Sequence, residues 1–282
     1  MKKIVMRMLI LFAGMCLATV TGMTADQEGV VRVATFNIRC PVDKTPNSWA
    51  ERKARVNALI ERHGFDLIGL QEATAGQIRD MLTPGWAYVG VGRKDGKECG
   101  EFSCIFYRKE RFDVEESGTF WLSETPEVAG SKSWNTACER VCTWALLRDR
   151  NTGKAFYHFN THLDHMSAAA RENGMALILK RIKALREGVP VVLTGDMNAV
   201  PGSVPVLKAL EVLRDAATES AVPHCGPEAT FNGFRVDKVP TSRIDYIFVS
   251  AGMRVLSHAT LDEKHDGLYP SDHFPVVVLL AL

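Results

Sequence analysis

Runs of apolar, β-branched residues alternate along this chain with stretches of helical periodicity. The apolar runs predict buried strands, and the periodic stretches predict helices. Strands are expected at residues 31–37, 66–71, 102–107, 143–147, 155–160, 189–194, 244–249 and 275–280. Helices are expected at residues 48–63, 167–187 and 204–216, the first opened by a Ser48–Glu51 capping box and ended by Gly64. This order predicts an α/β fold in which two packed β-sheets carry helices on the outside.

The first 25 residues are typical of a secretory signal peptide. A cationic start at Lys2 and Lys3 precedes a short apolar stretch, and small residues follow before the chain turns polar. The apolar stretch is too short to span a membrane comfortably. Cleavage fits after Gly22 or after Ala25. We therefore expect an exported protein, periplasmic or extracellular, that has no transmembrane segment after cleavage.

Residues 26–282 are expected to form one domain. They contain no linker-like stretch, no low-complexity segment and no internal repeat, and the 46% hydrophobic content is ample for a core. Lipid anchoring at Cys16 is the less favoured alternative to a free protein, because Met15 stands where a lipoprotein signal has a small residue. We expect the domain to be a monomer.

The charge balance argues against tight binding of long duplex DNA. The whole chain has 34 Lys and Arg against 33 Asp and Glu. Removal of the leader takes away Lys2, Lys3 and Arg7, which leaves 31 against 33, a net charge of −2. A protein that binds duplex DNA without sequence preference normally has a strong basic excess. The balance favours a small or locally recognised substrate.

Six cysteines follow the leader, and none of them forms a CxxC pair with zinc-finger spacing. An oxidising compartment would permit disulfides, but a domain of this size does not need them. We predict buried free thiols at Cys40, Cys99, Cys104, Cys138, Cys142 and Cys225.

Polar residues stand at the ends of nearly all the predicted strands. They are Asn37, Gln71–Glu72, Asn160–His162, Asp196–Asn198, Asp245 and Asp272–His273. The carboxyl ends of strands are where α/β folds place their chemistry. One Asp after a strand is more often a turn or a helix cap. Six such positions in one chain favour a functional site.

These residues suit metal-assisted chemistry on a phosphate ester. Glu72 and Asp272 supply the hard oxygen ligands that Mg²⁺ requires, and Asn37 adds a neutral carbonyl. Mn²⁺ is expected to substitute for Mg²⁺. Asp196, with Asn198 close by, could hold and deprotonate an attacking water.

Asp245 and His273 would form a carboxylate–imidazole pair in which the carboxylate favours the protonated imidazole. An imidazolium and a divalent cation around one phosphate stabilise the extra negative charge of a pentacovalent transition state. The set contains no Ser or Cys nucleophile, so it indicates direct attack by water.

Six short segments span almost the whole chain after its leader. They are TFNIR (35–39), GLQEA (69–73), FNTHLDH (159–165), LTGDMNA (193–199), SRIDYIFVS (242–250) and YPSDHFPV (269–276). In sequence and in order they resemble the motifs of the endonuclease/exonuclease/phosphatase superfamily, which includes DNase I-like nucleases and inositol polyphosphate 5-phosphatases. The resemblance implies a four-layer α/β sandwich with the site at one edge of the two sheets.

The resemblance also implies a role for each matched residue. Glu72 matches the principal metal ligand of the superfamily, with Asn37 and Asp272 beside it. Asp196 matches the aspartate that orients the water, and Asn198 matches the asparagine that contacts the scissile phosphate.

His162 matches a position at which relatives have a His or Tyr that contacts the phosphate, and Asp245 and His273 match the paired Asp and His. Further segments, NSWAERK (47–53), residues 89–112 and residues 117–134, resemble exported members common in Bacteroidetes. This closer resemblance implies mechanism and location more than it implies a substrate.

Four further residues are candidates for substrate binding. Arg39, Arg93 and Arg140 stand beside the motif segments and could receive substrate phosphate. Asn232 belongs to a segment, residues 229–234, that resembles a loop near the site in relatives. Solvated surface arginines are the competing interpretation.

A zinc hydrolase is an alternative, because His162, Asp164 and His165 overlap the HxHxDH signature. Asn160 stands where the first His would be, so that site would be short of a ligand. The zinc interpretation also leaves Glu72 unexplained. Asp164 and His165 are then expected to lie at the entry to a helix.

Residues 26–282 are thus predicted to be a catalytic domain that hydrolyses phosphate esters, as a phosphodiesterase or phosphatase, with a metal-assisted water oriented by Asp196. Its partner would be a phosphorylated small molecule, a nucleotide or nucleic acid. Two alternatives remain open. One is a nuclease acting on exported or environmental nucleic acid, and the other is an exported binding protein that kept the fold and lost catalysis.

Overall fold

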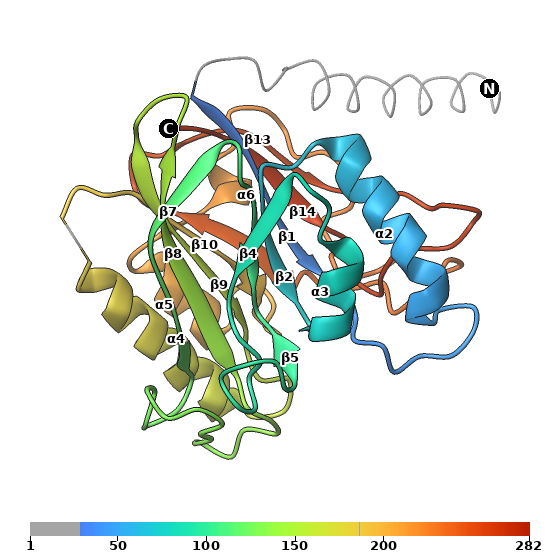
Figure 1. Ribbon diagram of the computed structural model, residues 1–282, viewed down its shortest axis with the longest axis horizontal. Coiled ribbons are helices and arrows are strands. Elements are labelled where there is room, and N and C mark those ends of the chain that lie inside the picture. The colour runs from blue at the N-terminus through green and yellow to red at the C-terminus, as the bar shows by residue number, and fades with distance from the viewer. Residues whose placement is uncertain (1–28, 186) are drawn as a thin grey trace.

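The computed structural model describes residues 29–185 and 187–282, which form two β-sheets packed face to face with helices outside them (Figure 1). This is the predicted α/β sandwich. The predicted signal peptide, residues 1–25, lies outside the described residues. Within the part of the chain that is described, no helix is both long enough and apolar enough to cross a membrane.

The first sheet has six strands. They are β1 (Val30–Asn37), β2 (Leu67–Gln71), β4 (Trp86–Val89), β6 (Ile105–Arg108), β13 (Arg254–Thr260) and β14 (Val276–Ala281). Their spatial order is β13-β14-β1-β2-β6-β4. A small separate pair, β3 (Ala73–Thr74) and β5 (Glu101–Phe102), lies next along the chain to β2 and β6.

The second sheet also has six strands. They are β7 (Phe112–Trp121), β8 (Val141–Asp149), β9 (Ala155–His162), β10 (Val191–Asp196), β11 (Arg214–Asp215) and β12 (Asp245–Val249). Their spatial order is β11-β12-β10-β9-β8-β7.

Each sheet contains one parallel pair of strands, and these pairs determine where the polar strand ends meet. β1 runs parallel to β2, which sets Asn37 opposite Gln71, and β9 runs parallel to β10, which sets His162 opposite Asp196. β12 runs antiparallel to β10, so its first residue, Asp245, lies opposite Asp196. Strand starts and strand ends from distant parts of the chain therefore gather at one edge.

Helices cover the two outer faces (Figure 1). The first sheet is covered by α2 (Trp49–His63) and α3 (Ala75–Met81), and the second by α4 (Ala168–Lys183) and α5 (Val204–Leu210). A short helix, α6 (Ala216–Glu219), follows β11.

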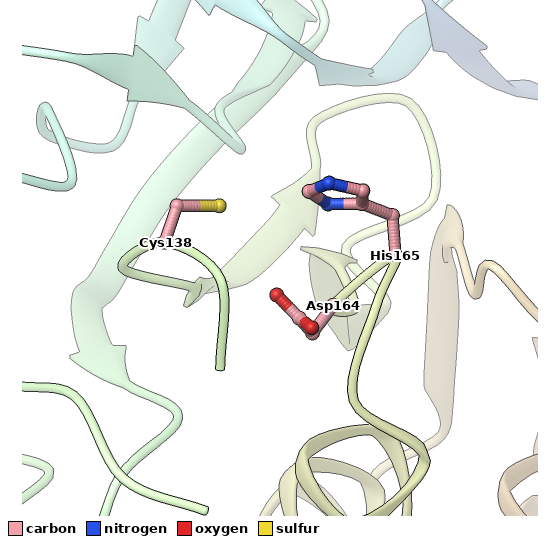
Figure 2. Close-up of side chains that lie close together, drawn as sticks. All are labelled: Cys138, Asp164 and His165. Carbon is pink, nitrogen blue, oxygen red and sulfur yellow. The ribbon is translucent and has the colours of Figure 1, made fainter. Parts of the chain in front are cut away.

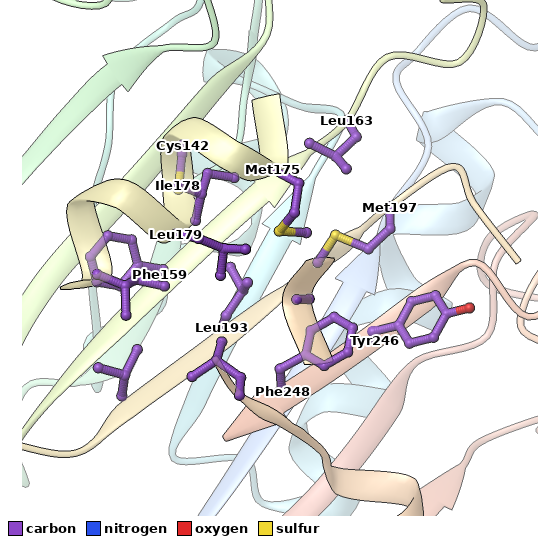
Figure 3. Packing of buried hydrophobic residues seen from close by; sticks show 14 of the residues in the cluster. Cys142, Phe159, Leu163, Met175, Ile178, Leu179, Leu193, Met197, Tyr246 and Phe248 are labelled. Carbon is purple, nitrogen blue, oxygen red and sulfur yellow. The ribbon is translucent and has the colours of Figure 1, made fainter. Parts of the chain in front are cut away.

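Three buried apolar clusters correspond to the three interfaces between these layers. One joins α2 and α3 to the first sheet, a second lies between the sheets, and a third joins α4 and α5 to the second sheet. Both faces of β1 are apolar because both are covered. Val33 faces the other sheet, and Phe36 belongs to the cluster under α2 and α3. Figure 3 shows part of the third cluster, in which Met175 and Leu179 of α4 pack with residues of the second sheet such as Phe159 and Leu193.

The two sheets approach closely at Gly69, where an added Cβ would overlap the side chains of Thr194 and Asn160. The Asn160 amide nitrogen donates to the backbone oxygens of Leu70 and Cys104, at 2.8 and 2.9 Å. Its Oδ1 accepts hydrogen bonds from Gln71 and Thr194. Asn160 thus joins the sheets and has no free donor or acceptor to offer a ligand.

Several details differ from the predicted elements. The Ser48–Glu51 capping box does not form, because Ser48 Oγ accepts no backbone N–H and lies 3.1 Å from Glu51 Oε2. Gly64 does end α2, in the left-handed conformation. A capping box forms instead at Thr74, where α3 begins.

The helix predicted at 204–216 stops at Leu210, because Arg214 and Asp215 pair with β12 as a strand. The helix predicted at 167–187 ends at Lys183. The run at 102–107 is divided between β5 and β6. Cys40, Cys99, Cys104, Cys138 and Cys142 are free thiols, as predicted, but only Cys104 and Cys142 are fully buried and Cys99 is exposed. The prediction of buried thiols was therefore wrong for Cys99, which lies in a surface loop.

Candidate active site

A cleft of about 640 Å³ opens at the edge where the polar strand ends meet. It is lined by six of the eight residues predicted to form the core of the site: Glu72, His162, Asp196, Asn198, Asp272 and His273. The other two, Asn37 and Asp245, are buried beneath it and hydrogen-bond to residues that line it. The structure therefore brings all eight together.

Hydrogen bonds from Cys40 and Asn37 hold the Glu72 carboxylate in place. Glu72 follows β2 with a φ of 59°, and its Oε2 accepts a hydrogen bond from the Cys40 backbone N–H at 3.0 Å. Asn37 Nδ2 donates to Glu72 Oε1 at 3.1 Å. Burial alone would raise the pKa of the Glu72 carboxyl, but these hydrogen bonds and the positive charges of His273 and Arg39 lower it. Glu72 is therefore ionised.

Asp272 lies across from Glu72. Burial raises the pKa of the Asp272 carboxyl, and the negative charge of Glu72 adds to the rise. The Arg39 guanidinium lies 3.8 Å from Glu72 Oε2 and 3.8 Å from Asp272 Oδ2. Two carboxylates that share one cation and repel each other are a suitable pair of ligands for a divalent ion.

The donors present fit Mg²⁺ or Mn²⁺, since they are carboxylate and amide oxygens. Among the described residues, however, Asp196, Asp245 and His273 also form a group of potential ligands on this edge, with ligand atoms within 4.8 Å of one another. Ion-paired, protonated His273 cannot ligate a cation, which leaves Glu72 and Asp272, with Asn37 beside them, as the better-suited set.

Asp196 ends β10 on the floor of the cleft. Its Oδ1 accepts a hydrogen bond from the Asn198 backbone N–H at 2.9 Å, and its Oδ2 accepts one from Asn37 Nδ2 at 3.0 Å. Burial and then the negative charge of Asp245 raise the pKa of Asp196 to about 7. A carboxylate with a pKa near neutrality is well matched to accept a proton from water.

Asp245 and His273 form the predicted pair. His273 Nδ1 lies 2.9 Å from Asp245 Oδ2, and His273 Nε2 lies 3.8 Å from Asp196 Oδ2. Burial would lower the pKa of His273, but the carboxylates of Asp245 and Asp196 raise it to about 10. His273 is therefore an imidazolium at neutral pH.

His162 is a neutral imidazole in the same cleft. Its Nε2 lies 3.0 Å from Asn198 Nδ2 and 3.4 Å from Asp196 Oδ2. Burial and the nearby Arg140 charge lower the pKa of His162 well below its ordinary value. Asn198 has a φ of 46° and also donates to the Leu163 backbone oxygen, which fixes its amide against the imidazole.

The four predicted substrate-binding residues do not share one position. Arg39, Arg93 and Arg140 line the cleft. Asn232 is buried beside the cleft, where its Oδ1 accepts from the Phe234 N–H and its Nδ2 donates to the Ser271 oxygen. Its side chain thus shapes a loop and does not line the cleft.

Sequence reasoning did not single out Arg52 or Phe231. Arg52 is fully buried, and its guanidinium donates to the backbone oxygens of Asn47, Ile38, Pro270 and Arg39. It joins the loop after β1 to the segment before Asp272. The segment NSWAERK contains it, and a charged residue on the apolar face of a predicted helix was the signal that could have found it.

Phe231 lies against His273, with ring centroids 5.0 Å apart in an edge-on arrangement, and it is 40% exposed. It lines the cleft together with Phe234. An aromatic surface next to the imidazolium could contact the apolar face of a substrate. Nothing in the local sequence separates such a ring from a core phenylalanine.

Figure 2 shows Cys138, Asp164 and His165 close together, and of these Cys138 and His165 line the cleft. Asp164 Oδ1 accepts from the Met166 and Ser167 N–H groups, as expected for a residue at the entry to α4. Since Asn160 joins the two sheets, the first ligand position of the zinc signature is not at this site. The zinc interpretation therefore lacks its ligand set.

Comparison with known proteins agrees with this geometry. Residues 34–273 match the model of the endonuclease/exonuclease/phosphatase family. A search of curated proteins found no match. A solved endonuclease/exonuclease/phosphatase from Bacteroides vulgatus is 37% identical, with a TM-score of 0.84 over 90% of this chain and 99% of that one.

A mannosyl-6-phosphatase from Bacteroides thetaiotaomicron is 36% identical, with a TM-score of 0.81 over 89% of this chain and 100% of that one. The human nocturnin catalytic domain, solved with a bound sulfate, is 20% identical at a TM-score of 0.70, covers 89% of this chain and 93% of its own, and is similar in fold alone. Members of the family that these comparisons identify are phosphoester hydrolases. With this fold, this cleft and a match from residue 34 to residue 273, the chain belongs to the endonuclease/exonuclease/phosphatase family.

Proposed function

We propose that this chain hydrolyses phosphate monoesters of small molecules by direct attack of water. The observation that carries the proposal is the position of Asp196. Its buried carboxylate lies on the floor of the cleft within 3.4 Å of His162 and 3.8 Å of His273. A base and an imidazolium so close to each other can act together on one phosphate, the base through the attacking water and the imidazolium on a phosphate oxygen.

In this mechanism Asp196 orients the attacking water and accepts its proton. The P–O bond to water forms as the ester P–O bond breaks, and the departing alkoxide takes a proton from solvent. The His273 imidazolium, held by Asp245, donates a hydrogen bond to a phosphate oxygen and stabilises the negative charge that develops there. Asn198 and His162 position the phosphate. Mg²⁺, or Mn²⁺ in its place, would be held by Glu72, Asp272 and Asn37 and would supply Lewis-acid stabilisation of the phosphate.

Three facts support a small monoester as the substrate. The mannosyl-6-phosphatase is 36% identical over its full length, and the net charge of the chain is only +1. The cleft of about 640 Å³ has the size of a small-molecule site. Sugar phosphates are therefore the first class to test.

The test is a panel of substrates with Mg²⁺, with Mn²⁺ and with EDTA. It includes sugar 6-phosphates, nucleotides, inositol phosphates, single-stranded oligonucleotides and sphingomyelin. Metal-dependent release of phosphate from sugar phosphates above all others is the expected result. Preferred cleavage of oligonucleotides would replace the proposal with a nuclease. No hydrolysis of any substrate with either metal would favour a silent binding protein.

We also propose that the chain is exported, cleaved near residue 22 or 25, and monomeric. The apolar leader after Lys2 and Lys3 supports the first part. Expression in a bacterial host, followed by fractionation and N-terminal sequencing of the periplasmic protein, tests it. Light scattering coupled to gel filtration tests the monomer.

A further inference from the structure

The three arginines that line the cleft differ in how their guanidinium groups are used. Arg39 donates to Asp43 from Nε and Nη2. Arg93 forms a two-pronged ion pair with Glu101, at 2.6 and 2.9 Å. Arg140 is only 5% exposed, and its Nε and Nη1 have no hydrogen-bond partner among the described residues. Of the three arginines, Arg140 alone has two of its three guanidinium nitrogens without a hydrogen-bond partner among the described residues.

Other unpartnered donors lie beside Arg140. Within the described residues, the ring Nδ1 of His162 and the Nε of Arg93 are also buried without a partner. Arg140, His162 and Arg93 all line the cleft, and all three also line a small cavity of about 10 Å³ next to it. Buried polar atoms are rarely left unpaired, and here they gather at one place on a cleft wall. This concentration points to a ligand that accepts hydrogen bonds.

The positive charge of Arg140 is only partly balanced by the protein. Asp164 Oδ2 lies 3.7 Å from Arg140 Nε, too far for a hydrogen bond. That oxygen already accepts hydrogen bonds from Thr136 Oγ1 and the Ala137 N–H. The third nitrogen, Nη2, lies 2.9 Å from His165 Nδ1, which brings no negative charge to the guanidinium. A buried guanidinium with unpartnered nitrogens and an incompletely balanced charge is energetically unfavourable. An anion that accepts hydrogen bonds from it would remove this cost.

The metal end of the cleft already has its own cation in Arg39, which is surrounded by Asp43, Glu72 and Asp272. Arg140 contacts none of these carboxylates. It lies on the side of His162. An anion held by Arg140 would therefore present its oxygens to the wall of the cleft that carries the imidazole.

We propose that Arg140, with His162 and Arg93 beside it, forms a subsite for an additional terminal oxygen of a phosphate monoester and so selects monoesters over diesters. This inference rests on the proposed function. A monoester carries three terminal oxygens and a charge of about −1.5 to −2, whereas a diester has two such oxygens and a single charge. The planar fork of a guanidinium binds two phosphate oxygens at once. In a diester, an esterified oxygen takes the place of the terminal oxygen that the guanidinium would bind.

The first test compares p-nitrophenyl phosphate with bis-p-nitrophenyl phosphate in the presence of Mg²⁺. The wild type should prefer the monoester. In Arg140→Gln, kcat/KM for the monoester should fall by roughly 10- to 100-fold, as for loss of charge-assisted hydrogen bonds, while that for the diester changes little. Retained diester hydrolysis also shows that the variant is folded. Arg140→Lys keeps the charge without the fork and should give an intermediate ratio.

Arg235→Gln is the matched control, because Arg235 lines the same cleft but is exposed. It should leave the ratio of the two activities unchanged. Equal loss of both activities in Arg140→Gln, an unchanged ratio, or a wild type that prefers the diester would each overturn the inference. If Arg140→Gln does not fold, the ratio in Arg140→Lys decides.

A second test does not depend on activity. Inorganic phosphate is titrated by calorimetry into the metal-free wild type and into Arg140→Gln. The wild type should bind phosphate, and the variant should bind it at least tenfold more weakly. Equal affinity would overturn the subsite. If the wild type hydrolyses neither ester, the proposed function fails. The phosphate titration then still tests whether Arg140 binds phosphate.

Discussion

At the scale of single residues, the cleft keeps two neighbouring groups in opposite protonation states. Burial raises the pKa of Asp196 to about 7, and the carboxylates around His273 raise its pKa to about 10. The two groups lie 3.8 Å apart. Between these values Asp196 is a carboxylate and His273 is an imidazolium, which is the combination that the proposed mechanism requires.

The rate should therefore depend on pH in a bell-shaped manner. Below pH 7 Asp196 takes up a proton and loses its function as a base, so kcat/KM should fall as the pH decreases. A cation bound at Glu72 favours the ionised Asp196, so this acid limb should lie at or below pH 7. Toward pH 10 His273 loses its proton, and kcat/KM should fall again. Initial rates from pH 5 to 10 measure both limbs. A flat profile on the acid side would contradict the role of Asp196.

Substitution of Glu72 or His273 should separate catalysis from folding. Glu72→Ala removes a proposed ligand of the cation, and His273→Ala removes the imidazolium. Each should reduce kcat by at least about a hundredfold, as expected for the loss of a group that stabilises transition-state charge. Circular dichroism and thermal unfolding should show both variants folded. His265→Ala is the control, since His265 is an exposed histidine that does not line the cleft. Near-normal rates in either test variant would contradict the assignment.

At the scale of elements, the site depends on how closely the two sheets approach each other. Gly69 of β2 leaves the space that Asn160 and Thr194 of the other sheet occupy. Asn160 in turn accepts a hydrogen bond from Gln71, the residue directly before Glu72. The strand that positions the proposed metal ligand is thereby fixed to the strand that continues to His162.

Gly69→Ala should therefore destabilise the fold strongly. Its Cβ would overlap side chains of the opposite sheet, so the free energy of unfolding should fall by about 1–3 kcal/mol or more, as for other overpacked cores. Gly76→Ala is the matched control. Gly76 lies in α3 with open space around it, and alanine there should stabilise by up to about 1 kcal/mol. Urea unfolding of both variants measures the difference. Equal stabilities would contradict the close approach of the sheets.

The elements also show where sequence patterns stop being sufficient. The apolar runs predicted β1, β2, β10 and β14 to within about two residues, because buried strands have few polar positions that blur their limits. The helix at 204–216 was overextended, because its last residues leave the helix to pair with β12. Only the tertiary partner of Arg214 and Asp215 makes them a strand.

At the scale of the whole molecule, the charge bears on the choice of substrate. The 34 Lys and Arg are balanced by 33 Asp and Glu, and arginines at the cleft are offset by Asp43, Glu72, Glu101 and Asp272. The chain should therefore bind duplex DNA no more tightly than about 10⁻⁴ M at physiological salt, the weak end of non-specific binding. Fluorescence anisotropy with a labelled duplex measures this affinity. Micromolar binding that weakens steeply with salt would contradict the prediction.

The sequence by itself predicted the chemistry proposed for this protein, because the residues that can bind a cation, hold a water or donate a hydrogen bond to a phosphate are rare at strand ends and appear there together. It predicted the α/β sandwich and the eight residues that the fold gathers at one edge. Only the tertiary structure decided how those residues are used. The roles of Asn160 between the sheets, of Asn232 within its loop and of Arg140 with its free fork depend on partners more than 20 residues away, and local patterns contain no information about such partners.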